Sequence, residues 1–291
     1  MIRKFNKSSV HRFTIIILSN LILLLFAFGP VLEVDAQRNE ATVAGDWTFD
    51  NGNAKDTSKN GIHGKFVGNP VSISGIVGKA FEFNGKGNGI GIPDSLLINT
   101  GGPYTDRTVA AFFKCKNISK NEKQVIFQEG GATRGLCIYV HSGKAYVGGW
   151  NRAEYNWNGA WISEKIRSNR WHHVALVIRN AAGKVEKDKL EMWLDGKLVD
   201  TEAGGQLHAH GNDTSIGYVT QKTIYHDGVE ELSNVGWFDG IIDEVLVYNS
   251  AFDGPDFRKI AHPLSIEPKG KSTTMWGDLK AKRTEKLGSD G

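Results

Sequence analysis

The chain has few of the residues that mark several well-defined classes of protein. Its 291 residues include only two cysteines, three methionines and seven prolines. The cysteines do not form a Cys-x-x-Cys pair, which argues against a structural zinc site. The sequence also lacks a Gly-x-Ser-x-Gly elbow and a phosphate-binding glycine loop, so it shows neither the nucleophile of an α/β-hydrolase nor a phosphate cradle.

Long apolar runs are absent after the amino end of the chain. Four basic residues precede an apolar run over residues 13–32, namely Arg3, Lys4, Lys7 and Arg12. Small residues follow at Val34 and Ala36, the positions that a signal peptidase reads. We therefore expect residues 1–36 to be a cleaved export signal. An uncleaved anchor is the alternative, because about 20 apolar residues can span a bilayer. Either interpretation predicts a secreted or cell-envelope protein with no further membrane contact.

The expected mature chain has almost no net charge. Residues 1–36 hold four basic and two acidic residues, of the 35 and 32 in the whole sequence, so the remainder has a net charge of +1. Nucleic acids and anionic membranes are bound through clustered positive charge. The sequence therefore predicts no nucleic-acid partner.

Glycine is abundant, with 35 residues, and it separates short runs of aromatic and β-branched residues. This composition favours an all-β chain with many tight turns. Both faces of residues 171–178 are apolar, as in a strand inside a two-layer sandwich. Apolar residues recur at period two over residues 190–194, and Asp195-Gly196 is a turn dipeptide that reverses the chain. This antiparallel unit is the predicted centre of the fold.

Several segments resemble the laminin-G-like, concanavalin A-like jelly-roll family. The segments are Trp171-His172-His173-Val174-Ala175 with residues 190–199, the turn containing Asp56, Ser58, Asn60, Gly61 and Gly64, the Gly-x-Ala-x-x-Phe-x-Gly of residues 78–85, and the final Gly240, Ile242, Asp243, Glu244, Val245 and Tyr248. The resemblance covers about residues 41–262. It implies a two-sheet antiparallel β-sandwich, or jelly roll, with the first and last strands side by side. Unrelated functions share this fold, so function has to be argued from a site.

We expect one domain over residues 37–262 and a polar tail over residues 263–291, in which Trp276 is a candidate recognition or tethering element. Strands are predicted at residues 43–50, 108–116, 125–128, 135–140, 145–149, 214–219 and 236–248, and one or two helical turns at 252–261. Residues 78–85 and 88–93 are interpreted as a hairpin, and residues 150–161 and 180–189 as irregular connections.

Cys115 and Cys137 are predicted to lie on separate strands. In an oxidising compartment a disulfide between them would join these strands. Two separately buried thiols are the alternative, because sequence spacing does not show that their Cα atoms lie within about 7 Å of each other.

A structural calcium site is predicted near Asp50, Asp56, Asn60 and Asp243. The first three residues lie in a turn rich in carbonyl and amide groups, and Asp243 lies on the last strand, which should pair near the first. Oxygen ligands of this kind suit a hard cation. Many domains of the resembled family bind calcium. The alternative is that Asp56 only caps its turn.

Trp150, Tyr155 and Trp157 are the candidate ligand-binding residues. Sugar rings stack on exposed aromatic rings, and the neighbouring asparagines would supply hydrogen bonds. Tyr155 and Trp157, in the least periodic part of the chain, are expected to be exposed. The alternative places Trp150 and Trp161 in the core, with Trp161 the better candidate for burial.

Glycoside hydrolysis would require paired carboxylates on one strand face. Glu186, Asp188 and Glu191 imitate that spacing, but the lysines between them do not suit a core-facing position, so we interpret the segment as solvated and predict no enzymatic activity. The expected function is non-catalytic binding of a glycan. The alternative is an adhesive module that recognises an extracellular surface protein. Exposed coplanar rings in residues 150–161 would favour the glycan, and buried rings would favour protein.

Overall fold

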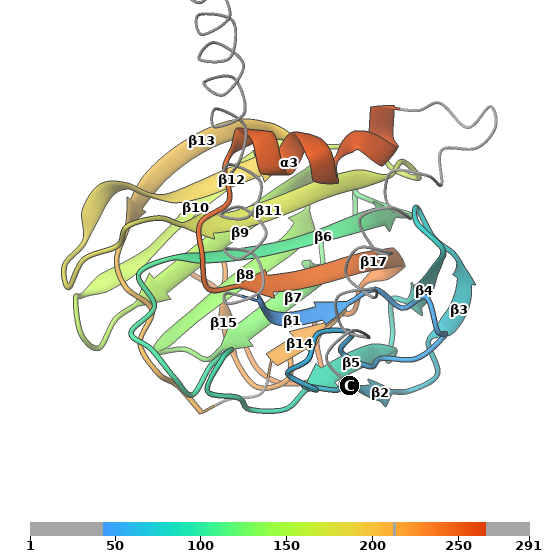
Figure 1. Ribbon diagram of the computed structural model, residues 1–291, viewed down its shortest axis with the longest axis horizontal. Coiled ribbons are helices and arrows are strands. Elements are labelled where there is room, and N and C mark those ends of the chain that lie inside the picture. The colour runs from blue at the N-terminus through green and yellow to red at the C-terminus, as the bar shows by residue number, and fades with distance from the viewer. Residues whose placement is uncertain (1–42, 212–213, 266–291) are drawn as a thin grey trace, which may run out of the picture. The chain divides into compact units, whose positions relative to one another are not determined.

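The computed structural model describes residues 43–211 and 214–265, which form a β-sandwich of two large antiparallel sheets (Figure 1). The predicted export signal, and the predicted tail beyond Ser265, lie outside the described residues. Among the residues that are described, no helix is long and apolar enough to cross a membrane.

The first sheet has eight strands. Seven of them follow the order β13 (Lys197–Gly204), β12 (Glu186–Leu194), β11 (His172–Ile178), β6 (Arg107–Cys115), β17 (Asp239–Tyr248), β4 (Lys79–Asn84) and β3 (Val71–Ser74). The eighth, β1 (Val43–Trp47), pairs with β17. The predicted pairing of the first strand with the last is therefore confirmed.

The second sheet has seven strands in the order β10 (Trp157–Lys165), β9 (Lys144–Asn151), β8 (Arg134–His141), β7 (Gln124–Gly130), β14 (Thr214–Ile216), β5 (Gly89–Ile92) and β2 (Lys65–Val67). A small ribbon of β15 (Thr223–Ile224) and β16 (Glu230–Glu231) follows β14. Helix α3 (Gly254–Ile260) and the 3-10 turn η1 (His262–Ser265) come after β17.

Strand β11 is central, as predicted, and lies between β12 and β6. Val174, Leu176 and Ile178 enter the core between the two sheets, while Ala175 and Val177 face outward under α3. Because both faces are covered, the strand needs no polar side, which explains its continuous apolar run. Figure 1 shows α3 along the β11–β12–β13 side of this sheet.

Three predictions of local structure are wrong. Residues 78–85 and 88–93 do not form a hairpin, because β4 belongs to the eight-stranded sheet and β5 to the seven-stranded sheet. Residues 150–161 are not one irregular segment, because Trp157 begins β10, which pairs with β9. Strand β12 begins at Glu186, inside the predicted connection of residues 180–189, although its first residues are mostly exposed.

The predicted disulfide is also wrong, since both cysteines are free and buried. Cys115, on β6, belongs to the core between the sheets, where its sulfur lies 3.6 Å from Gln124 Oε1. On β8, Leu136 and Ile138 point into that core, so strand alternation turns Cys137 to the opposite, outer face of its sheet. The two sulfurs therefore lie on different sides of the seven-stranded sheet.

Candidate functional site

Trp150 and Trp157 are buried, with 0% and 3% of their surfaces exposed. Trp150 lies on the outer face of the seven-stranded sheet in a cluster with Tyr225, and its indole Nε1 donates to Gly131 O at 2.8 Å. Trp157 points into the core between the sheets. The expectation that Trp157 would be exposed is therefore wrong, because an irregular register between Trp157 and Ala160 turns its side chain inward.

Tyr155 is half-buried at the edge of the core. Its hydroxyl lies 2.6 Å from His208 Nε2 and donates to Gln206 Oε1 at 3.0 Å. These contacts already use the polar end of the side chain. A ligand-binding role for Tyr155 remains a prediction.

Trp161 is the half-buried tryptophan of this region, contrary to the expectation that it would be the more buried of the pair. It lies on the outer face of β10 and packs against the cluster that contains Trp150. The two indole rings are nearly parallel, with ring centroids 6.5 Å apart and an interplanar angle of 19°. The ring of Trp150 is therefore covered, and the ring of Trp161 is partly open to solvent.

The indole of Trp161 lies against the sheet over two glycines. A Cβ on Gly148 would lie 2.2 Å from Trp161 Cδ1, and a Cβ on Gly159 would lie 2.2 Å from Trp161 Cη2. Only residues without a side chain allow the ring to approach both positions this closely. Trp150 lies on Gly135 in the same way, with Cζ2 2.6 Å from the position of a Cβ. The two glycines thus leave room for the ring of Trp161 to pack directly on the backbone of the sheet.

A pocket of about 630 Å³ lies beside this ring, and its lining includes Tyr146, Lys144, Ser163 and His226. Together with Trp161, these residues are called the Trp161 face below. His226 stacks on Tyr146, with ring centroids 4.2 Å apart at an interplanar angle of 23°. The Trp161 face therefore combines aromatic rings with an ammonium, a hydroxyl and an imidazole.

The imidazole of His226 is held by Tyr139. The Tyr139 hydroxyl accepts the backbone N–H of His226 at 3.1 Å and lies 2.8 Å from His226 Nδ1. Burial raises the pKa of Tyr139 far above its usual value, so the phenol keeps its proton. When the phenol donates to Nδ1, the neutral imidazole carries its proton on Nε2. Desolvation lowers the pKa of His226, which favours this neutral form.

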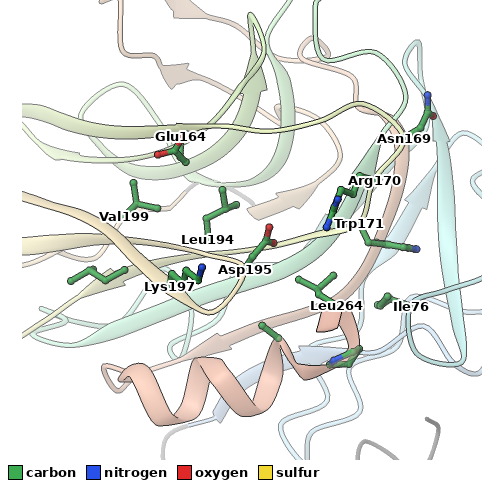
Figure 2. Close-up of a pocket in the computed structure, with 13 residues that line it drawn as sticks. Ile76, Glu164, Asn169, Arg170, Trp171, Leu194, Asp195, Lys197, Val199 and Leu264 are labelled. Carbon is green, nitrogen blue, oxygen red and sulfur yellow. The ribbon is translucent and has the colours of Figure 1, made fainter. Parts of the chain in front are cut away.

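A second pocket, of about 820 Å³, lies at the turn between β12 and β13 (Figure 2). Its lining includes Trp171, Arg170, Glu164 and Asp195. Asp195 is occupied by its own fold, because Oδ1 accepts the backbone N–H of His173 at 2.9 Å and Oδ2 lies 2.9 Å from His172 Nδ1. Figure 2 shows Glu164 and Asp195 on separate segments of the chain. We therefore assign Asp195 to the architecture of the turn.

The acidic segment that imitates a glycosidase motif is likewise engaged in structural contacts. Glu191 pairs with Arg179, Glu186 pairs with Lys184, and Asp188 accepts a hydrogen bond from Thr201 at 2.6 Å. Asp188 also has a φ of 57°, which breaks the strand alternation that a catalytic pair would need. The geometry assigns these carboxylates to contacts within the fold, in a segment that was predicted only to be solvated.

The four predicted calcium ligands fall into two pairs. Asp56 accepts four hydrogen bonds from the backbone of Asp46, Ser58 and Ile62 and from the Ser58 hydroxyl, at 2.8 to 3.0 Å. Asn60 donates its amide to Val43 O at 2.7 Å. Both side chains tie their loop to β1, which favours the alternative of a turn cap over a ligand role.

Asp50 and Asp243 instead contact the turn between β3 and β4. Asp243 Oδ2 accepts the backbone N–H groups of Ile76 and Val77 at 3.0 and 3.2 Å, and Asp50 Oδ1 accepts that of Lys79 at 3.1 Å. Over residues 43–211 and 214–265, no group of three or more His, Cys, Asp or Glu side chains is placed to hold a metal ion. The calcium site remains a prediction, with Asp50 and Asp243 as the pair that lies at one turn.

Comparison with known proteins identifies the family. A family model for the concanavalin A-like lectin/glucanases superfamily matches residues 84–256. The chain belongs to this superfamily. No curated protein sequence matches the chain.

Solved structures that resemble this superfamily member include binding domains. One is domain 4 of AbnA, a GH43 extracellular arabinanase from Geobacillus stearothermophilus, in complex with arabinotriose; it is 18% identical with a TM-score of 0.55, over 75% of this chain and 98% of that domain. Another is the binding domain of Paraclostridial Mosquitocidal Protein 1, 13% identical with a TM-score of 0.59, over 76% of this chain and 52% of that chain.

A third is the binding domain of botulinum neurotoxin DC in complex with SialylT, 12% identical with a TM-score of 0.58, over 77% of this chain and 52% of that chain. The protein thus spans about half the length of each toxin binding domain it matches. At these identities the likeness establishes the fold alone.

Proposed function

We propose that the protein binds carbohydrate without cleaving it, and that the sugar stacks on the ring of Trp161. The observation that carries this proposal is the orientation of the indole, which lies flat over Gly148 and Gly159 and remains partly open to solvent. An aromatic ring fixed in this way presents an apolar face to the C–H groups of a sugar without losing rotamer entropy on binding.

Polar groups around the ring supply the rest of a carbohydrate site. His226, Ser163 and Lys144 line the pocket beside the ring. Small-ligand sites combine apolar surface with a few fixed polar groups of this kind. Binding of arabinotriose and of SialylT by two proteins of similar fold supports the proposal without extending their ligands to this chain.

Recognition of a protein is the alternative, and the burial of Trp150 and Trp157 favours it. Of the four large aromatic residues between positions 150 and 161, Tyr155 and Trp161 are left partly open. A test should therefore separate Trp161 from the remaining surface of the domain.

The test is a titration of the purified protein with a panel of soluble oligosaccharides, repeated with Trp161→Ala. Loss of binding in this variant is expected for any glycan that the wild type binds. Trp193→Ala is the matched control, because Trp193 is also half-buried but lies on the other sheet, packed against Phe257. Equal binding by the wild type and Trp161→Ala would overturn the assignment of the site, and a panel without any binder would favour the protein-recognition alternative.

A further inference from the structure

We infer that the carbohydrate bound at the Trp161 face is acidic, carrying carboxylate or sulfate groups. This inference rests on the proposed function and specifies its ligand class. It is carried by the charges that the fold places on the same outer face as the indole ring.

Two lysines stand opposite each other beside Trp161. Lys144 and Lys165 are cross-strand partners in the pairing of β9 with β10. Strand alternation puts Lys165 on the same face as Trp161, and Lys144 on the same face as Tyr146. Like charges directly opposite each other destabilise a sheet. A bound anion between them would remove this repulsion.

Neither lysine has an internal counter-ion in the described part of the chain. The nearby acidic groups already pair with other lysines. Asp227 forms a salt bridge with Lys123 at 2.8 Å, and Glu230 forms one with Lys222 at 2.6 Å. One carboxylate, Glu202, also lines the pocket, and it comes from β13 of the opposite sheet. Lys144 in the pocket lining and Lys165 opposite it on β10 therefore place two positive charges beside the ring, against the one carboxylate of Glu202.

Two imidazole rings lie on the β8 side of this site. The rings of His141 and His226 lie 5.4 Å apart, and His141 lies 6.4 Å from the ring of Tyr146. The cations near His226 also include Lys123 and Lys144, and they contribute to its lowered pKa, with Asp227 as the opposing acid. A neutral His226 donates from Nε2 to an anionic oxygen, and a charged one attracts it further. The acids on this side are engaged within the fold: Asp227 pairs with Lys123, and Glu231 accepts the hydroxyl of Tyr225 at 2.9 Å.

The test compares three hexasaccharides of similar length: an oligogalacturonide, a sulfated galactan fragment and a neutral galactan fragment. At low ionic strength we expect the protein to bind at least one acidic probe about tenfold or more tightly than the neutral probe, a preference that salt should reduce. The two acidic arms distinguish carboxylate from sulfate recognition.

Lys144→Gln with Lys165→Gln should weaken binding of the acidic probe far more than binding of the neutral probe, and so remove the preference. Lys55→Gln with Lys59→Gln is the matched control, because it removes the same charge from exposed positions in the loop after β1 and should keep the preference. Trp161→Ala should weaken binding of every probe.

Two contrary results have different meanings. Equal or tighter binding of the neutral probe by the wild type, or a preference that survives in Lys144→Gln/Lys165→Gln, would overturn the acidic-glycan inference alone. Failure of the wild type to bind any oligosaccharide would overturn the proposed function, and this inference with it.

Discussion

The two outer faces of the sandwich are covered in different ways. On the eight-stranded sheet, Phe252 and Phe257 from the segment around α3 pack onto Ala110, Ala175 and Val177, and this apolar cluster is buried. We call this the helix-covered face. On the seven-stranded sheet, the chain around β15 covers Trp150 and Tyr139 but leaves Trp161 partly open at the margin.

The side chains of each sheet account for this difference. Alanines at positions 110 and 175 leave room for a helix to lie on the strands, so the large residues come from the helix. On the other sheet the large rings belong to the strands and lie over glycines, so a short ribbon covers only part of them. The helix-covered face is therefore built for stability, and the Trp161 face leaves a rigid ring available for a ligand.

The largest expected effect is on the helix-covered face. Phe257 is fully buried, so Phe257→Ala should lower the free energy of unfolding by about 3–5 kcal/mol through lost transfer energy and a cavity. Urea unfolding measures this change. A loss below about 1 kcal/mol would show that α3 contributes little to the fold.

The next effect is a pH dependence on the same face. His173 lies between Phe112 and Phe257, and its burial lowers its pKa to about 4. The unfolded chain binds a proton at this histidine below its ordinary pKa of 6.5, whereas the folded chain does not until about pH 4. Stability from this group is therefore complete above pH 6.5 and is lost as the pH falls toward 4, by ~3 kcal/mol.

His173→Phe should flatten this part of the curve of unfolding free energy against pH. His226 gives the comparison from the Trp161 face: its side chain is only half-buried, so His226→Phe should leave most of the acid dependence in place. An unchanged pH profile in His173→Phe would contradict the assignment.

A smaller effect tests the calcium prediction on the eight-stranded sheet. Asp243 pairs in register with Phe112, and with Asp50 it contacts the turn between β3 and β4. A calcium ion bound there would stabilise this turn, so EDTA should lower the melting temperature by several degrees and excess calcium should restore it. If the melting temperature is the same with and without chelator, the calcium prediction fails.

On the Trp161 face the corresponding truncation should be mild. Trp161 is half-buried, so Trp161→Ala should lower the free energy of unfolding by less than about 2 kcal/mol, well below the loss in Phe257→Ala. The same urea measurement tests both variants. Equal losses would show that Trp161 is a structural residue and would weaken its proposed role in binding.

The sequence was sufficient to predict what depends on local pattern. The apolar run of β11, the turn at Asp195-Gly196 with φ values of 50° and 78°, and the pairing of β1 with β17 follow from periodicity, turn chemistry and the family resemblance. The hairpin of residues 78–93 was wrong because a glycine-rich turn does not reveal which sheet the next strand joins. Phe83 pairs with Gly240 and Ile90 with Ile216, partners distant in sequence.

The aromatic site was mispredicted for a related reason. The register irregularity after Trp157 changes which residues of β10 face the core. The residues that cover Trp150 lie around Tyr225, far along the chain. One signal in the sequence could have identified Trp161: Gly148 and Gly159, the glycines on which its ring lies, occur within two strands that carry large aromatic residues. Recognising it required the pairing of β9 with β10.

The smallest effect concerns the two cysteines. Cys115 reports on the inner core, and Cys137 reports on the cluster at the outer face of the seven-stranded sheet. Because they form no disulfide, a reductant should leave the melting temperature unchanged. Burial raises the pKa of Cys115 to about 11 and that of Cys137 to about 12, so thiolate content alone would make Cys115 the faster to react. Cys137, however, lies in the cluster covered by the short β15–β16 ribbon, and local opening of that ribbon exposes it without separating the two sheets.

We therefore expect Cys137 to react first with a thiol reagent under native conditions. The rates are measured in Cys115→Ala and Cys137→Ala, each of which retains one thiol. Faster labelling of the variant that retains Cys137 would show that the cover of the Trp161 face opens more readily than the core. Faster labelling of Cys115 would show that this cover is as firmly held as the inner core, and would remove the distinction between a firmly covered and a loosely covered face.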